Sequence, residues 1–408
     1  MTRDIDDILT FCVNLCRNMI LSGSSLERTS LAAEIICHSY SLSDVSIFLL
    51  STQMSIAARD SEGNYSSRQI SIPPAAIHLE RLRSLNRLSY KVAEITPNPK
   101  TLDQMLERSM NVPCYSECVI IGGKICAMVC LGFMFGATFL DILPIVAITV
   151  LIHFLMSCLE HTGLDHILTN SLTMWVASSC AVMLIYGGFG VNFAVTMTTV
   201  SMLVIPGIPL VNAMRNLLCG REINGILQML KITVDTGALA AGIYAAFMMF
   251  GGVVLNDAAH GLSNPFMLVA LSFLASVGFG IVFSIPPKDL WLAGLGGALS
   301  RISLIVLPTM IESRLLYMTL SASVAALYAE FFAVKRRQPS TYFIYPSIIP
   351  LIPGDLFFYA ISGLYLGNRS WTEINGVNCL ISLLGLSAGF VFASAAAHHI
   401  RIRRYIYS

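Results

Sequence analysis

The chain has 408 residues, of which 55% are hydrophobic and 12% are charged, and its mean hydropathy is +0.71. Soluble globular domains usually carry about 25% charged residues, so most of this chain must be solvated by lipid. The net charge of +1, without a basic stripe interleaved with aromatic residues, argues against nucleic acid as a partner. We therefore expect an integral membrane protein whose main surroundings are membrane lipid.

The start of the chain and its cysteines limit the compartment and the cofactors. Residues 1–7 are acidic and lack a basic segment followed by an apolar core, so we expect no cleaved signal peptide and a cytoplasmic N-terminus. The 11 cysteines are odd in number, which argues against a disulfide framework. Because no histidine or acidic pattern accompanies them, we predict no metal and no other cofactor. Three pairs have helical spacing, which suits either packing or zinc: Cys12 with Cys16, Cys114 with Cys118, and Cys126 with Cys130.

Residues 1–115 are polar enough to form a separate small α+β domain. Apolar residues at helical spacing predict a helix over residues 4–21, and Ser24 or Ser25 can cap a second helix that ends near Tyr40. Strands are predicted at 45–50, 53–58 and 69–72, with a turn at 60–64. A basic amphipathic helix follows, and its apolar side either covers this core or docks on an anionic membrane. That side consists of Leu79, Leu82, Leu85, Leu88 and Val92.

Ten hydrophobic segments follow, each long enough to cross a bilayer. They cover residues 119–140, 142–159, 167–186, 191–218, 224–250, 265–285, 290–309, 315–334, 342–366 and 374–396. The loops on one side hold nearly all the basic residues, so the positive-inside rule predicts both termini in the cytoplasm of a bacterial inner membrane. The inner set is Arg215, Arg221, Lys288, Lys335, Arg336, Arg337, Arg401, Arg403 and Arg404, and the outer set is Arg314 and Arg369.

Two proline-glycine phrases, at residues 203–210 and 350–355, interrupt hydrophobic segments. Proline removes a backbone donor, so such a break is tolerated in a bilayer only where protein or a water-filled cavity satisfies the freed groups. From the rise of about 1.5 Å per residue, both breaks fall near the midplane of a ~30 Å core. The half-helices after Pro206-Gly207 and Pro353-Gly354 would aim positive dipole ends at the centre, where they attract carboxylates or other anions.

The second half of the hydrophobic region repeats the first. Residues 222–225 and 373–376 both read Glu-Ile-Asn-Gly, and Gly132, Phe135 and Asp141 have equally spaced counterparts at Gly280, Phe283 and Asp289. Each copy holds an odd number of segments, so the second must insert upside down, an arrangement typical of transporters. The predicted fold is an all-α polytopic membrane protein, with ten transmembrane helices in two inverted five-helix repeats (residues 116–251 and 265–397). The small α+β domain at 1–115 precedes these repeats.

Charged residues at membrane depth are costly, so they usually line a bundle interior or a cavity. Lys231 and Asp235 lie four apart in the fifth segment, either as a mutually neutralising pair or as a substrate cation and a proton carrier. The second copy has Ser382 and Leu386 at these positions, so shared packing does not require the pair.

Asp355 follows the second break, where the first break has Ile208. It either caps the half-helix or accepts a proton or an amine at the centre. Arg301 lies in the middle of the seventh segment and suits bidentate binding of a carboxylate, with Glu312 or a lipid headgroup as alternative partners.

Further polar residues have a packing and a functional interpretation each. Asn212 and Tyr359 follow the two breaks at similar distances and can hydrogen-bond either substrate or neighbouring helices. His153 is expected to pack. The acid-histidine group in a predicted inner loop suits solvation better than zinc; it comprises Glu160, His161, Asp165 and His166. Two glycine pairs allow close helix approach within one chain or in a homo-oligomer: Gly132 with Gly136, and Gly385 with Gly389.

The phrase at residues 204–212, followed by Gly220 and the helix start at Asn224, resembles the threonine/serine exporter family. Residues 21–23 with Glu27-Arg28 resemble that family's leading motif. The second half resembles the smaller module that split members encode separately, some of which are linked to dicarboxylate export. The resemblance covers nearly the whole chain and implies export of small hydrophilic metabolites driven by the proton gradient.

We therefore expect a secondary transporter and not an enzyme, with a small amino acid or carboxylate and protons as partners. Threonine and serine are the first expectation. A succinate-like dicarboxylate exporter and a passive channel are alternatives, and an intramembrane hydrolase that pairs Asp235 with Asp355 is a further one. Substrate binding is expected at Pro206, Gly207, Asn212, Lys231, Arg301, Pro353, Gly354 and Tyr359, and proton coupling at Asp235 and Asp355.

Overall fold

The structure is a computed structural model that describes residues 2–50, 52–73, 77–113, 115–205, 207–250, 261–336 and 338–407. It divides into two compact units. The N-terminal unit comprises Met1–Tyr115, Phe283–Pro287 and Phe332–Tyr342, and the membrane unit comprises Ser116–Val282, Lys288–Phe331 and Phe343–Ser408.

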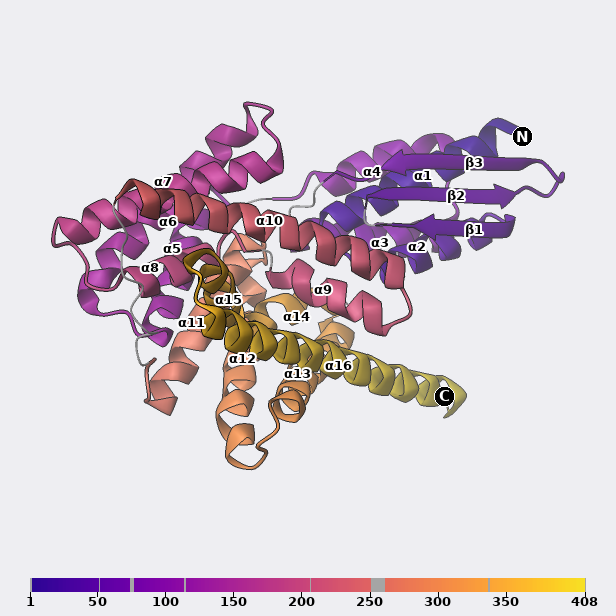
Figure 1. Cartoon of the computed structure of the whole chain (residues 1–408). Coiled ribbons are helices and arrows are strands. Elements are labelled where there is room, and N and C mark those ends of the chain that lie inside the picture. The colour runs from indigo at the N-terminus through magenta and orange to yellow at the C-terminus, as the bar shows by residue number, and fades with distance from the viewer. Residues whose placement is uncertain are drawn as a thin grey trace. The chain divides into compact units, whose positions relative to one another are not determined.

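The N-terminal unit packs helices on one antiparallel sheet of strand order β1-β2-β3 (Figure 1). Ser25 caps the second helix, where its hydroxyl accepts from the Arg28 N–H. The predicted turn is confirmed, because one Asp60 oxygen accepts from the N–H groups of Glu62 and Asn64 at 2.9 and 2.8 Å. The elements are α1 (Thr2–Leu21), α2 (Leu26–Ser39), β1 (Ser43–Leu49), β2 (Gln53–Arg59), β3 (Tyr65–Ser71), α3 (Leu79–Ile95), η1 (Pro99–Thr101) and α4 (Leu102–Met110).

The burial of the apolar side of α3 decides whether this side covers the domain core or docks on a membrane. All five of its predicted side chains are buried in the core of the N-terminal unit, where α3 packs against α1, α2 and α4. Docking of this face on a membrane is therefore wrong. β3 begins four residues earlier than the predicted strand, since its side chains alternate between exposed and half-buried and are mostly polar.

The N-terminal unit also includes residues from two connections between later helices. The Leu79 N–H donates to the Phe283 carbonyl oxygen at 2.8 Å, and the Tyr115 hydroxyl donates to the Ile285 carbonyl oxygen at 2.6 Å. Both hydrogen bonds lie within the N-terminal unit, and both acceptors are backbone carbonyl oxygens of residues 283–287.

The membrane unit consists of helices. In the first half they are α5 (Glu117–Met134), η2 (Phe139–Asp141), α6 (Ile142–Glu160), α7 (His166–Tyr186), α8 (Phe193–Ser201), α9 (Gly207–Leu218) and α10 (Glu222–Met249). In the second half they are α11 (Pro265–Val282), α12 (Pro287–Val306), η3 (Leu307–Thr309), α13 (Arg314–Arg336), α14 (Thr341–Ile348), η4 (Ile349–Leu351), α15 (Gly354–Leu366) and α16 (Arg369–Tyr407).

Eight helices among the described residues are long and apolar enough to cross a membrane. A ninth span is formed if the bent pair Thr341–Leu351 and Gly354–Leu366, which meet at 56°, counts as one. The remaining predicted span, residues 191–218, corresponds to the short helices α8 and α9, and Pro206 between them lies outside the described residues. Ten spans therefore remain a prediction.

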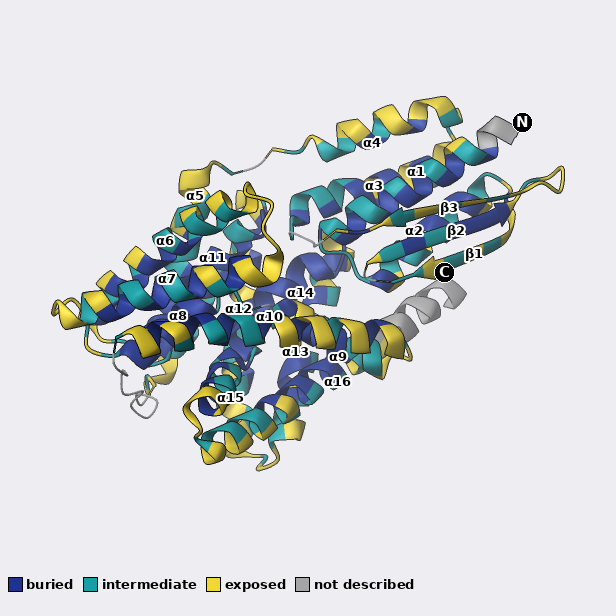
Figure 2. Ribbon diagram, turned by 45° about the horizontal axis from the view of Figure 1, so that its top comes forward, coloured by how far each residue is buried: buried dark blue, intermediate teal, exposed yellow. Residues whose placement is uncertain are grey.

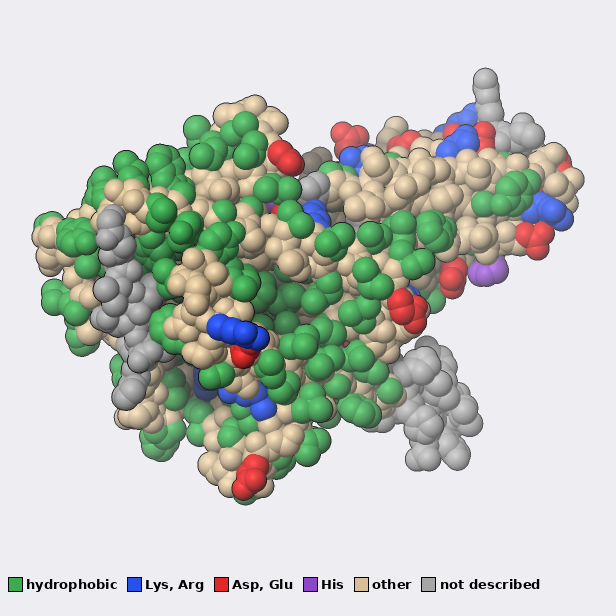
Figure 3. Space-filling view, in the orientation of Figure 1, with side chains coloured by type: hydrophobic (Ala, Val, Ile, Leu, Met, Phe, Trp, Pro, Cys, Tyr) green, Lys and Arg blue, Asp and Glu red, His purple; other side chains and the backbone are tan. Residues whose placement is uncertain are grey.

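The surface and the interior of the membrane unit are both apolar. Hydrophobic side chains cover the face of its helices in view in Figure 3, and large apolar residues such as Phe154, Leu230 and Met248 are more than half exposed. Lipid is the solvent that such a surface requires. All nine residues of α8 are buried, so this half-helix lies inside the bundle (Figure 2).

Close helix pairs within the chain use glycine. α5 packs along α11, α7 along α10, and α15 along α16. A Cβ added at Gly123 of α5 would lie 3.0 Å from the Gly278 carbonyl oxygen of α11. Gly385 and Gly389 of α16 face backbone atoms of Leu315 and Thr319 in α13, so this predicted glycine pair packs within one chain.

Candidate functional site

The two proline-glycine breaks have the same local structure. At the first, the Ile205 N–H donates to the Ser201 carbonyl oxygen at 2.8 Å, and the Gly207 N–H donates to that of Ile205 at 2.8 Å. At the second, the Ile352 N–H donates to the Ile348 carbonyl oxygen at 3.2 Å, and the Gly354 N–H donates to that of Ile352 at 2.9 Å. Each break is therefore a tight turn that starts a new helix at the glycine.

The breaks also touch each other. A Cβ added at Gly207 would lie 3.0 Å from Cγ2 of Ile352, and one added at Gly354 would clash with the sulfur of Met202. Gly207 thus packs against the second break, and Gly354 packs against Met202, which directly precedes the first break. A larger side chain at either glycine would therefore push the two turns apart. The two breaks therefore lie next to each other in the membrane unit.

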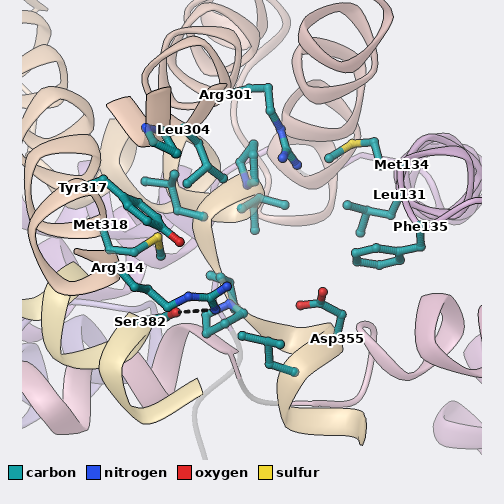
Figure 4. Close-up of a pocket in the computed structure, with 17 residues that line it drawn as sticks. Leu131, Met134, Phe135, Arg301, Leu304, Arg314, Tyr317, Met318, Asp355 and Ser382 are labelled. Carbon is teal, nitrogen blue, oxygen red and sulfur yellow. Dashed lines mark hydrogen bonds between the residues drawn. The ribbon is translucent and has the colours of Figure 1, made fainter. Parts of the chain in front are cut away.

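A cavity of about 340 Å³ adjoins the second break (Figure 4). Helices of the second half form most of its wall, and α5 contributes from the first half. Its apolar lining is Leu131, Met134, Phe135, Leu304, Pro308, Met318, Ile349, Pro350, Leu351, Ile352, Pro353 and Leu356. The polar lining residues are Arg301, Arg314, Tyr317, Asp355 and Ser382.

Three charged side chains enter this cavity from three helices. Figure 4 shows Arg301 of α12, Arg314 of α13 and Asp355 of α15 pointing toward the same space. The Arg301 Nε donates to the Ser272 hydroxyl at 3.1 Å, and one Arg314 terminal nitrogen lies 3.5 Å from the Ser382 hydroxyl. In the part of the chain that is described, no salt bridge joins Asp355 to either arginine.

This arrangement can bind a small charged solute. An arginine fork binds a carboxylate through two parallel hydrogen bonds, and a carboxylate accepts from an ammonium group. The apolar wall strengthens these interactions, since charges attract each other more in a low dielectric than in water. Because Ser272 engages the Nε of Arg301, the terminal nitrogens of that guanidinium are the ones that face the cavity.

Asp355 does not cap its helix. The N-cap position of α15 belongs to Pro353, and no side-chain hydrogen bond caps this end. Asp355 instead lies in the first turn, where the helix dipole favours a negative charge, with its carboxylate directed into the cavity. Arg301 likewise donates to Ser272 and forms no salt bridge with Glu312 among the described residues.

Other predicted site residues lie outside this cavity. The Asn212 amide nitrogen donates to the Tyr345 hydroxyl at 3.3 Å, and the Tyr359 ring packs edge-on against Trp371 with centroids 5.8 Å apart. Both contacts are between helices. Lys231 is exposed on α10. Pro206, the remaining predicted binding residue, is outside the described residues.

Asp235 has a different partner from the one that its spacing suggested. Its carboxylate lies 3.5 Å from Nδ1 of His166, which begins α7, and no ion pair with Lys231 occurs in the described ranges. The Asn170 amide nitrogen contacts the same histidine nitrogen at 3.0 Å. Asp235 does not line the cavity that contains Asp355, so the structure does not bring these carboxylates to one hydrolytic site.

Equivalent positions of the two halves make equivalent contacts. The register that aligns Gly132 with Gly280 also aligns Lys124 with Ser272 and His153 with Arg301. Lys124 Nζ lies 3.1 Å from His153 Nδ1, as Arg301 Nε lies 3.1 Å from the Ser272 hydroxyl. His153 is therefore bonded between helices, and is more than a packing residue.

The same register aligns His166 with Arg314, each the first residue of its helix. His166 faces Asp235 on α10, and Arg314 faces Ser382 on α16. The remaining acid-histidine residues do not converge: Asp165 caps α7, and the described residues contain no group of three or more potential metal ligands.

Arg314, Tyr317 and Ser382 line the cavity but were not predicted as site residues. The predicted hydrophobic segment begins one residue after Arg314, whereas α13 begins at Arg314, and its side chain lines the cavity. The alignment of the two halves could have indicated Ser382 as a site residue. It aligns Ser382 with Lys231, and a polar residue in both copies at one depth indicates a shared polar position.

Two family models match consecutive parts of the chain. One, described as "Putative threonine/serine exporter", matches residues 10–250. The other, described as "Threonine/Serine exporter, ThrE", matches residues 268–396. No curated protein and no solved structure gives a significant match. The first match ends one residue after α10, and the second begins within α11.

Proposed function

Because the chain belongs to the threonine/serine exporter family, with both family modules in one polypeptide, we propose that it is a secondary transporter that exports threonine and serine. It is a multi-pass membrane protein of an exporter family, and its substrate is a small molecule. The observation that carries the specific proposal is the cavity beside the second break, which combines Arg301 with Asp355.

A zwitterionic amino acid matches these two groups. Arg301 binds the α-carboxylate through its terminal nitrogens, and Asp355 accepts from the α-ammonium group. The apolar residues of η4 and α5 exclude water around the bound solute, which strengthens both contacts. The volume of about 340 Å³ is at the small end of the range for ligand sites, as a solute of this size requires.

Export follows from alternating access between the two halves. The equivalent turns at the breaks, their reciprocal contacts, and the matched pairs Lys124–His153 and Ser272–Arg301 support an inverted repeat. In such transporters the two copies rock around a fixed central site. We place both termini in the cytoplasm of the bacterial inner membrane, on the basis of the basic loops.

The proton gradient drives this cycle through a carboxylate that changes its protonation state. Asp355 is the first choice because it shares the cavity with the arginines, so its protonation changes the charge that the solute meets. Asp235 is the alternative, since it is buried and faces His166. An antiporter that releases the solute as Asp355 takes up a proton couples the two flows.

A dicarboxylate is the second candidate substrate. The cavity contains two arginines, and each can bind one carboxylate when Asp355 is protonated and neutral. This candidate differs from the first in its requirement for protonated Asp355, so acidic conditions favour it.

Exchange in proteoliposomes tests both candidates. Purified full-length protein is reconstituted, the vesicles are loaded with unlabelled threonine or succinate, and entry of the labelled solute is followed with and without a pH gradient. We expect saturable threonine exchange that the gradient accelerates. Exchange of neither solute contradicts the transport proposal, flux that ignores the gradient contradicts proton coupling, and flux that does not saturate indicates a channel.

A further inference from the structure

Charge in the cavity does not balance. Arg301 and Arg314 contribute two positive charges, and ionised Asp355 contributes one negative charge. An uncompensated charge at membrane depth is costly, so a bound solute with a net negative charge stabilises this site more than a neutral zwitterion does. We propose that Arg314 binds a second carboxylate of the solute, so that the site binds amino acids with an acidic side chain. This inference rests on the proposed transport function.

The two guanidinium groups form separate binding positions. Arg301 is held by Ser272 of α11, whereas Arg314 is held by Ser382 of α16. Figure 4 shows them entering from different sides, with Asp355 on a third. A solute that has two carboxylates and one ammonium group therefore meets one complementary partner at each of its charged groups.

The aligned position of the first half has an acidic side chain beside it. His166 aligns with Arg314, and the carboxylate of Asp235 lies 3.5 Å from it. In the second half, the position that aligns with Asp235 is Leu386, and the group that contacts Arg314 is the neutral hydroxyl of Ser382. The protein thus leaves the charge of Arg314 to be met by Asp355 or by the solute.

The serine contact also orients the arginine. One terminal nitrogen of Arg314 lies 3.5 Å from the Ser382 hydroxyl, which leaves the other donors for the cavity. Arg314 is therefore a specificity-determining residue, and Ser382 is a positioning residue that acts through it.

The test compares two amino acids that differ in the second carboxylate. Full-length protein in proteoliposomes exchanges labelled L-aspartate and labelled L-threonine, and the ratio of the two rates is measured for wild type and variants. We expect wild type to exchange both solutes, and unlabelled aspartate to inhibit threonine exchange. In Arg314→Gln the aspartate rate should fall at least about tenfold more than the threonine rate, because the glutamine lacks the charge.

Two further variants separate charge from fold. Arg314→Lys keeps the positive charge and should restore part of the aspartate rate, and Ser382→Ala should lower the ratio less than Arg314→Gln does. Arg369→Gln is the matched control, because Arg369 is exposed and pairs with Glu373 at the start of α16. It should leave the ratio at the wild-type value.

The outcomes distinguish this inference from the transport proposal. If wild type exchanges threonine but not aspartate, the inference fails and the transport proposal stands. If Arg314→Gln lowers both rates equally, or if only succinate and not aspartate is exchanged, the inference is also overturned. If no solute is exchanged, the transport proposal fails, and the inference fails with it.

Discussion

The two halves of the membrane unit share their order of helices but differ in how they satisfy charge. In the first half, Lys124 contacts His153, and His166 contacts Asp235, so each titratable group has a partner on a neighbouring helix. In the second half, the hydrogen bonds of the aligned arginines within the described residues go to serine hydroxyls, and both arginines line a cavity with Asp355. The charges that line the cavity therefore come from the second half, whereas the aligned polar groups of the first half contact one another.

The largest effect should come from the aligned pair Arg301 and His153. Arg301→Gln should lower threonine exchange by about 30-fold or more, because loss of one partner of a desolvated charge pair costs about 2–5 kcal/mol. His153→Gln, at the aligned position, should change the rate by less than about threefold. Exchange rates in proteoliposomes measure both, and equal losses would show that the two halves contribute alike.

The second comparison concerns the two buried carboxylates. Asp355→Asn should remove the acceleration of threonine export by a pH gradient and raise the threonine concentration at half-maximal rate about tenfold, because asparagine keeps an oxygen acceptor but has neither the negative charge that attracts the ammonium group nor a proton to exchange. Asp235→Asn should have the smaller effect on the gradient response. A larger effect of Asp235→Asn would indicate that proton coupling depends on the first half.

The two break glycines should differ in stability. Gly354→Ala should destabilise the protein by about 1–3 kcal/mol, since its Cβ would clash with the sulfur of Met202. Gly207→Ala should cost less, because its Cβ would lie 3.0 Å from Ile352. Thermal unfolding in detergent measures both, and Met202→Ala should recover part of the Gly354→Ala loss. Recovery of Gly207→Ala by the same change would contradict the assigned contacts.

The smallest effect concerns His78 in the N-terminal unit, and it separates stability from transport. Its Nδ1 accepts from the Arg81 N–H at the start of α3, and burial, with the nearby Arg81 charge, lowers the pKa of His78. The unfolded state therefore binds a proton more readily, so this contribution is complete above about pH 6.5 and decreases as pH falls below it. His78→Asn, which can still cap α3, should reduce this acid sensitivity in unfolding scans. A changed pH profile of transport would instead link the N-terminal unit to coupling.

Much of the fold follows from local patterns in the sequence. The N-terminal helices and strands have clear apolar spacing, and Ser25 and Asp60 make the cap and turn that their chemistry favours. The broken helices follow from proline and glycine alone. The number of membrane spans does not follow from these patterns. The hydrophobic segment 191–218 corresponds to the two helices α8 and α9, and each of them is too short to cross a membrane alone.

The site was only partly predictable, for physical reasons. Arg301, Pro353 and Asp355 lie deep in hydrophobic segments, where a charge or a break requires a special environment. Arg314 lies at a segment boundary, where arginine is usual, so only the tertiary position of α13 shows that it lines the cavity. Likewise Asp235 faces His166, which lies far away in the sequence. Helical spacing alone favoured a pair with the nearer Lys231.

Location of the bound solute is the most direct test of the central claim that the second half binds it. An electron cryomicroscopy structure of the full chain in nanodiscs with saturating threonine, compared with one without it, would locate the added density. We predict density between Arg301 and Asp355 beside Pro353. Density beside Asp235 and His166, with none in the cavity at the second break, would contradict the account.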